Sequence, residues 1–225
     1  MTILRRVLVV GLGVALLLTS HASAAAPGQY HHLGAVSTGE WSGVLGRLTV
    51  RDSGVRVNTH DFVATRLMVK GEAAGKTVWL EAGWAEAGWS GNGKQRIYTY
   101  DTGRNSWTFY DKYPLADGEQ VWISVHTEKD DVWQAWLYWR DAWHLLATAK
   151  LPLGGRGHVE QFVEVHTDGT AFAVPRIAVD NVQVRDGAAA RYWREPEVPT
   201  AFSDASGGYC VAWATKFDTW SAGTC

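Results

Sequence analysis

Short segments in which hydrophobic and polar residues alternate follow one another through most of the chain. They occupy residues 44–50, 61–69, 77–84, 95–100, 106–111, 120–127, 133–140, 143–149, 159–166 and 177–185. A period of two, with many β-branched and aromatic residues, indicates β-strands. Turn-forming glycine, asparagine and aspartate separate the segments, and none shows a helical repeat over about eleven residues. The pattern therefore predicts an all-β fold, an antiparallel β-sandwich of two packed sheets with a concave outer face.

Three of these strands are predicted to have one apolar face and one face of polar and aromatic side chains. The polar faces comprise Trp79 and Glu81 in the first strand, Gln120, Trp122, Ser124 and His126 in the second, and Glu160, Phe162, Glu164 and His166 in the third. Glu81 and Glu160 lie in the middle of otherwise apolar strands, where burying a charge is costly. A solvated cleft or acid–base chemistry is the usual reason for such a position. If the three strands are neighbours in one sheet, their polar faces form a single groove.

The two ends of the chain differ from the predicted sandwich. Arg5 and Arg6 precede an apolar run at residues 7–18, and small residues follow at 22–24. This pattern is typical of a secretory signal peptide. The expected divisions are a signal peptide at residues 1–24, a flexible N-terminal segment at 25–39, the β-sandwich domain at 40–185 and a C-terminal appendage at 186–225. The protein is thus expected to be secreted and extracellular, with no membrane attachment after the signal is cleaved.

Export makes a disulfide the expected state of the two cysteines, Cys210 and Cys225. The bridge would close the C-terminal appendage and contribute roughly 3 kcal/mol according to the loop-entropy argument.

The composition narrows the class of ligand. The sequence has a formal net charge of −2, which gives no electrostatic reason to expect binding to nucleic acid or to an anionic membrane. It contains 13 tryptophans, more than a core of this size needs, so some are expected to line a surface or cleft. Indole rings stack on sugars and grip peptide side chains, which favours a polypeptide or polysaccharide partner. No phosphate loop, dinucleotide fingerprint or metal-binding loop is recognisable, so neither a cofactor nor a metal is expected.

Two carboxyl groups across a groove can perform several kinds of chemistry. One can remain ionised as a base or nucleophile while burial raises the pKa of the other and makes it the acid. Such a pair serves glycosidases and also peptidases that activate a water molecule. Glu81 and Glu160 could equally be ordinary solvated residues on an outer sheet face. Arg66, on the strand predicted at residues 61–69, could neutralise a groove carboxylate or simply be exposed.

Several motifs carry a resemblance to glutamic peptidases. Residues 80–84, Leu-Glu-Ala-Gly-Trp, followed by Gln-Arg-Ile-Tyr-Thr-Tyr at 95–100, resemble the neprosin family. Over residues 40–185 the chain is also similar to the eqolisins. The matching segments are Glu-Trp-Ser-Gly-Val at 40–44, Glu-Ala-Gly at 81–83, Trp-Thr-Phe-Tyr-Asp-Lys-Tyr-Pro at 107–114, Gly-Glu-Gln-Val at 118–121, Glu-Gln-Phe-Val-Glu at 160–164 and Val-Asp-Asn-Val at 179–182.

The resemblance implies a concanavalin-like β-sandwich in which Glu81 and Glu160 face each other in a concave groove. Glu81 lies where the eqolisins have their catalytic glutamine, and Glu160 matches their catalytic glutamate, so the pair would be Glu/Glu as in neprosin. The hypothesis is a secreted peptidase with an acidic optimum. One glutamate would act as general base on a water, and the other, protonated, would donate to the scissile carbonyl.

Four aromatic residues are candidates for the substrate subsites of this groove, although each could instead belong to the core. They are Trp41, Trp79, Trp122 and Phe162. The alternative functions are a non-catalytic, lectin-like carbohydrate-binding sandwich and a glycosidase that uses the same two glutamates.

Overall fold

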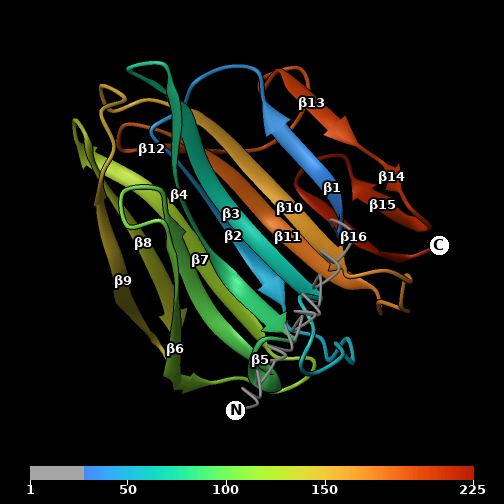
Figure 1. Ribbon diagram of the computed structural model, residues 1–225. Helices are drawn as coiled ribbons and strands as arrows, with labels where there is room; N and C mark the ends of the chain where they lie inside the picture. The colour runs from blue at the N-terminus through green and yellow to red at the C-terminus, as the bar shows by residue number, and fades with distance from the viewer. Residues whose placement is uncertain (1–27) are drawn as a thin grey trace, which may run out of the picture.

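The computed structural model describes residues 28–225, which form two antiparallel sheets packed as a β-sandwich (Figure 1). The predicted fold class is therefore confirmed. The expected signal peptide at residues 1–24 lies outside the described residues. Residues 28–225 contain no helix with the length and apolarity that a membrane span requires.

The first sheet has seven strands, and its outer face carries the candidate site. In spatial order the strands are β13 (Thr200–Ser203), β1 (Gln29–Ser37), β10 (His158–Thr167), β3 (Phe62–Ala73), β4 (Lys76–Ala87), β5 (Ser90–Asp101) and β6 (Ser106–Pro114). All the pairings between these strands are antiparallel.

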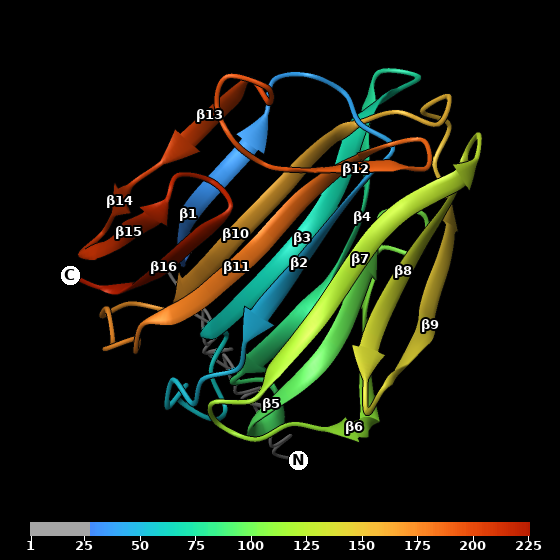
Figure 2. The ribbon, with the colours of Figure 1, turned by 180° about the vertical axis from the view of Figure 1, so that it is seen from behind.

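The second sheet has nine strands (Figure 2). In spatial order they are β14 (Ala205–Ser206), β15 (Tyr209–Thr215), β16 (Thr219–Thr224), β11 (Ile177–Asp186), β2 (Gly43–Thr49), β7 (Gln120–Lys129), β8 (Val132–Trp139) and β9 (Ala142–Lys150), with β12 (Ala189–Tyr192) paired to β11. The strand predicted at residues 120–127 is thus β7, in the sheet opposite β4 and β10. The condition for a single groove, that all three strands are neighbours in one sheet, is therefore met by β4 and β10 but not by β7.

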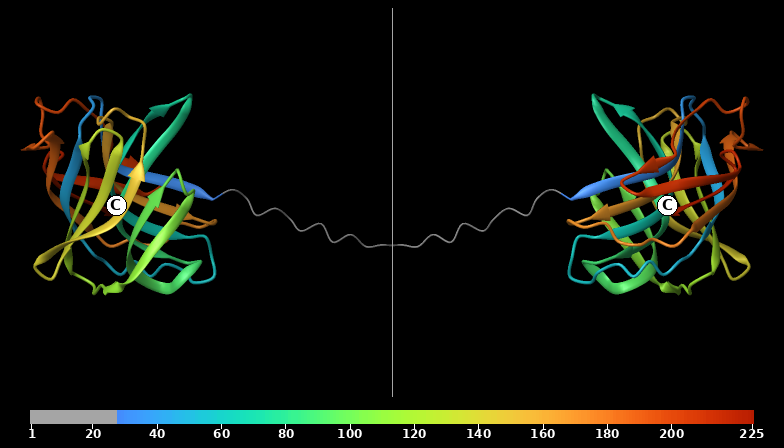
Figure 3. Two further views of the ribbon diagram at one scale, coloured as in Figure 1. Left: turned by 90° about the vertical axis from the view of Figure 1, so that its left-hand side faces the viewer. Right: turned by 90° about the vertical axis from the view of Figure 1, so that its right-hand side faces the viewer.

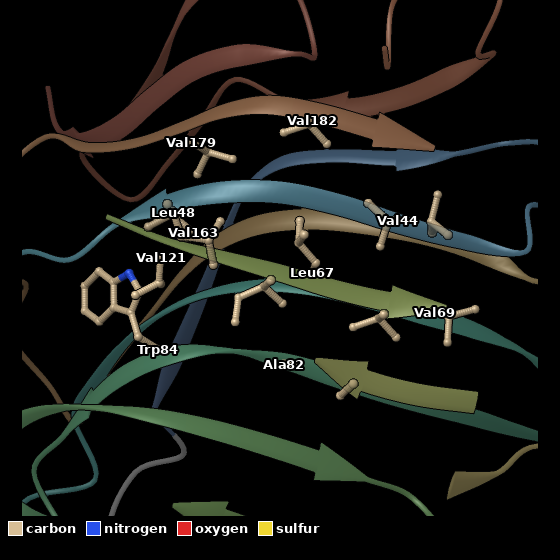
Figure 4. Close-up of a cluster of buried hydrophobic side chains, with 14 of the residues drawn as sticks. Val44, Leu48, Leu67, Val69, Ala82, Trp84, Val121, Val163, Val179 and Val182 are labelled. Atoms are coloured by element: carbon tan, nitrogen blue, oxygen red, sulfur yellow. The ribbon is translucent and has the colours of Figure 1, made fainter. Parts of the chain in front are cut away.

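The apolar faces of the two sheets meet in one continuous core (Figure 4). Leu67 and Val163 from the first sheet and Leu48 and Val121 from the second have at most 1% of their surface exposed. Complete burial of a valine or leucine side chain is worth about 1.5–3 kcal/mol. Alternation therefore fixes which face of each strand turns inward, and the opposite face is left for polar and aromatic side chains.

The N-terminal segment is more ordered than its sequence suggests. Gln29–Ser37 forms β1, which lies between β10 and β13 in the seven-stranded sheet (blue in Figure 3). Leu33 and Ala35 have no exposed surface, and their burial explains why this segment pairs with the sheet. The expectation of a flexible segment at residues 25–39 is therefore wrong for Gln29–Ser37.

The C-terminal residues extend both sheets and do not form a separate appendage. β13 adds to the edge of the first sheet, and β16 pairs with β11 in the second. Trp193, Phe217 and Trp220 from this region are at most 2% exposed in the shared core. The sandwich therefore continues to the end of the chain, past the predicted boundary at residue 185.

The two cysteines lie close together at the end of the second sheet. Cys210 is in β15 and Cys225 directly follows β16, and both are free thiols, so the structure does not confirm the expected disulfide between them. The contact with the Cys225 thiol lowers the pKa of the Cys210 thiol, and a hydrogen bond from Arg176 Nη2 to Cys210 Sγ lowers it further. The pairing of β15 with β16 holds this end of the chain without a covalent bridge.

Candidate functional site

A groove with a volume of about 920 Å³ runs along the outer face of the seven-stranded sheet. Side chains from β1, β3, β4, β5, β6 and β10 line it. Glu81 and Glu160 both lie on its floor, where they are 7% and 3% exposed. The structure thus brings together the two glutamates singled out in the sequence.

Strand register explains why the two glutamates meet. Met68 on β3 is directly opposite Glu81 on β4 and also directly opposite Glu160 on β10. The three residues form one row across the sheet, and cross-strand partners point to the same face. The glutamates therefore flank a single central strand, and both side chains enter the groove.

Arg66, two residues before Met68 on the same face of β3, connects the acidic residues of the floor. Its Nη1 donates to Glu160 Oε2 at 3.0 Å, and its Nε donates to Glu164 Oε2 at 3.0 Å. The same Nε lies 3.7 Å from Glu81 Oε2. The carboxyl groups of Glu81 and Glu160 therefore both contact the same guanidinium group, that of Arg66.

The residue facing Arg66 across the β3–β4 pair is Gly83. A Cβ atom at this position would lie 1.9 Å from the carbonyl oxygen of Thr65, so no larger residue fits there. The glycine of the Glu-Ala-Gly motif is thus required for the close approach of the two strands beneath the site.

Three further side chains complete the polar floor. The ammonium group of Lys70 pairs with Glu160 Oε1, and Tyr98 Oη donates to Glu81 Oε1 at 3.1 Å. His32 on β1 lies 3.5 Å from Glu164. If Glu81 carries a proton, the charges of Glu160 and Glu164 are balanced by the two cations, Arg66 and Lys70.

The environment separates the protonation states of Glu81 and Glu164. Burial raises the pKa of Glu81 to about 7, against the opposing attraction of Arg66, and the neighbouring carboxylates raise it further. Burial also acts to raise the pKa of Glu164, but Arg66 and His32 outweigh it and bring this pKa down to about 2. In mildly acidic solution the floor therefore holds both a neutral carboxylic acid and a carboxylate.

Aromatic side chains form much of the groove wall. Trp79 stacks on Tyr100 with their ring centroids 5.5 Å apart. The guanidinium carbon of Arg66 lies 5.4 Å from the centroid of the Phe162 ring. Trp107 packs between neighbouring rings, and Trp89 is 40% exposed at the rim. The predicted subsite residues Trp79 and Phe162 are therefore in the groove.

The other two predicted subsite residues lie elsewhere. Trp41 is 8% exposed in the core between the sheets, next to Gly157. Trp122 is on the outer face of the second sheet, where the guanidinium of Arg47 lies 5.7 Å from its ring. The alternation in β7 does produce one polar face, but that face belongs to the opposite side of the sandwich.

Sequence reasoning missed Lys70, Tyr98 and His32. Tyr98 and Tyr100 alternate with inward-facing residues on β5. This alternation could have indicated that both tyrosines lie on the same face of the sheet as Glu81. Lys70 sits near the end of a strand, where a lysine is ordinary, and its role depends on the pairing of β3 with β10. Within residues 28–225 no group of three or more His, Cys, Asp and Glu side chains is arranged to hold a metal ion.

Comparison with known proteins gives structural matches alone. No protein-family model and no curated protein sequence matches the chain. Scytalido-glutamic peptidase with a transition state analog inhibitor superimposes with a TM-score of 0.64 at 11% identity, covering 88% of this chain and 100% of that one. SCP-B, a member of the eqolisin family in a complex with the tripeptide Ala-Ile-His, gives 0.59 at 11% identity with the same coverage.

A third similar structure is aspergilloglutamic peptidase from Aspergillus niger, with a TM-score of 0.50, 8% identity and coverage of 73% and 99%. The chain shares its fold with these glutamic peptidases. At such low identity the likeness concerns the fold alone, and the chemistry must be argued from the groove.

Proposed function

We propose that this protein is a secreted, glutamic-peptidase-like hydrolase that cleaves peptide bonds at acidic pH with Glu81 and Glu160. The observation that carries the proposal is the row of Glu81, Met68 and Glu160 across the groove floor, in which burial raises the pKa of Glu81 to about 7. The fold that the chain shares with glutamic peptidases supports the same hypothesis.

In the proposed reaction Glu160 is the general base and Glu81 the acid. Glu160 takes a proton from a water molecule whose oxygen forms a bond to the scissile carbonyl carbon. Protonated Glu81 donates a hydrogen bond to the carbonyl oxygen, where negative charge develops. The C–N bond then breaks, and the proton held by Glu160 passes to the leaving amine.

The position of Glu81 gives this assignment a physical basis. The resemblance to eqolisins places their glutamine at this position, and a glutamine side chain donates through its N–H group. A glutamic acid donates through O–H from the same place, but only while it is protonated. Because the pKa of Glu81 is raised to about 7, the donor form is present in acid and is lost as the pH rises above that value.

Lys70 would regulate access to the base. It pairs with Glu160, and its side chain is 36% exposed, so it can swing away when a substrate enters. Arg66 is 6% exposed and held by several carboxylates, and it therefore stays in place as a fixed positive charge beside the reacting atoms.

The test is cleavage of a denatured protein mixture at pH 4–5 by the wild type and by Glu160→Gln. Loss of a general base is expected to reduce the rate by a factor of about 10²–10⁴. Glu197→Gln, at an exposed glutamate outside the groove, serves as the matched control and should retain full activity. Equal rates for wild type and Glu160→Gln, or no cleavage by the wild type, would contradict the proposal.

A second candidate function, non-catalytic carbohydrate binding in the same groove, is favoured by one observation. Glu160 is already paired with both Arg66 and Lys70, and the half-buried ring of Trp79 and the exposed ring of Trp89 line the same groove. Binding of an oligosaccharide that persists in Glu160→Gln but disappears in Trp79→Ala, without any peptide cleavage, would support this alternative.

A further inference from the structure

A second cavity lies on the outer face of the nine-stranded sheet, on the opposite side of the sandwich from the groove. Its volume is about 410 Å³, within the usual range for small-ligand pockets. Residues of strands β2, β7, β8, β9, β11 and β12 and of the turn before β12 line it. Its main lining residues are Leu45, Ser124, His126, Trp136, Trp143 and Arg185.

His126 is a buried polar group at this cavity. Only 8% of its surface is exposed, and its Nδ1 shares a hydrogen bond of 2.8 Å with Ser124 Oγ. Gly43 lies directly opposite, and a Cβ there would be 2.4 Å from the Cβ of His126, so the glycine makes room for the imidazole. Within residues 28–225, Nε2 makes no hydrogen bond and lies 3.8 Å from Glu128 Oε1. It is therefore available to a ligand.

The charges around the cavity compensate one another. Burial lowers the pKa of His126 to about 4, and the positive charge of Arg185 contributes to the same shift. The imidazole is thus neutral at ordinary pH. Arg185 and Glu128 provide one positive and one negative group at the rim. The site offers hydrogen-bond donors and acceptors with little net charge, which matches a neutral hydroxylated molecule.

The walls of the cavity are aromatic and continue into a strip across the sheet. The ring of Trp136 lies nearly parallel to His126, at 12°, and Trp143 is 45% exposed. Trp122 on β7 pairs in register with Tyr138 on β8, and Tyr138 pairs with Trp143 on β9. These three cross-strand partners form an aromatic row beside the cavity, which we call the aromatic strip.

We propose that this cavity binds a neutral pyranose ring of a polysaccharide, and that neighbouring sugars of the chain extend over the aromatic strip. Indole faces provide the stacking surface for the apolar faces of sugar rings. Ser124, His126, Arg185 and Glu128 provide partners for the hydroxyl groups. The site is separate from the groove and does not depend on peptide hydrolysis there.

The experiment is native affinity electrophoresis of the full chain in gels that contain hydroxyethyl cellulose, galactomannan or polygalacturonate. At least one of the two neutral polymers is expected to retard the wild type. Trp143→Ala should weaken that binding, because it removes a stacking ring. The expected loss is about tenfold in affinity. His126→Ala should weaken it as well. Since Trp143 is an exposed residue outside the core, its replacement leaves the core intact.

Two controls separate this site from the groove. Trp79→Ala removes a groove ring and should leave retardation unchanged, and Trp143→Ala should leave peptide cleavage unchanged. The proposal is overturned if neither neutral polymer retards the protein, if only polygalacturonate does, or if Trp79→Ala abolishes binding while Trp143→Ala does not.

Discussion

One guanidinium group shared by three carboxyl groups sets the chemistry of the groove at the scale of residues. Arg66 contacts Glu81, Glu160 and Glu164 on a floor that is largely closed to water. Two of these carboxyl groups have clearly different pKa values, about 7 for Glu81 and about 2 for Glu164. The raised pKa of Glu81 suits the acid role proposed for it, whereas Glu164 accepts a hydrogen bond from Arg66 and takes no part in the proposed reaction.

Glu81→Gln is expected to make stability less sensitive to pH. The pKa of Glu81 rises from 4.5 to about 7 on folding, so its contribution to stability is complete below pH 4.5 and is lost as the pH rises to 7. The loss amounts to about 3 kcal/mol. Relative to the wild type, Glu81→Gln should therefore gain about 3 kcal/mol in unfolding free energy between pH 4 and pH 8. Urea denaturation at both pH values measures this, and a pH-independent difference would refute it.

Glu164→Gln should show the opposite dependence. The pKa of Glu164 falls from 4.5 to about 2 on folding, so its contribution is present above pH 4.5 and is lost as the pH falls to 2. We expect the variant to be destabilised by about 3 kcal/mol at pH 6, with the difference from the wild type shrinking toward pH 2. Thermal unfolding at pH 6 and at pH 2.5 gives the comparison, and equal differences at the two would count against this role for Glu164.

At the scale of elements, the positions of the strands determine what the side-chain pattern can mean. β4 and β10 carry their glutamates to one groove because β3 lies between them. β7 has the same kind of polar face, but it pairs with β2 in the other sheet, so His126 lines the second cavity and Trp122 lies in the aromatic strip beside it. Alternation along one strand predicts a face, whereas the pairing of distant strands decides which surface that face joins.

The pairing of β15 with β16 leads to a prediction about the cysteines. This pairing places Cys210 beside Cys225, and both thiols are free. We propose that an oxidising environment joins them, in keeping with the expected export of the protein. Treatment with oxidised glutathione should remove both free thiols in a thiol assay without forming dimers, and should raise the unfolding free energy by up to roughly 3 kcal/mol. Thiols that persist, or oxidation that produces covalent dimers, would rule out the bridge.

At the scale of the whole molecule, the sequence was sufficient to predict the fold class and to predict that Glu81 and Glu160 line one groove. The burial of alternate residues between the sheets is a property of each strand by itself, and it is visible in the chain. The strand Gln29–Ser37 could not be recognised because the polar residues His31 and His32 interrupt the alternation of apolar and polar residues in this segment. The shared role of Arg66 and the contribution of Lys70 could not be predicted, because they depend on register between strands far apart in sequence.

The most direct measurement for the proposed activity is the pH dependence of kcat/KM for a peptide substrate, for the wild type and for Glu81→Gln. If Glu81 acts as a protonated hydrogen-bond donor, wild-type activity should be high in acid and fall about tenfold per pH unit above pH 7. Glutamine donates an N–H at every pH, so Glu81→Gln should remain active and lose this fall. An identical fall near pH 7 in both proteins, or no cleavage by the wild type at any pH, would contradict the assignment of Glu81 and Glu160 as the reacting pair.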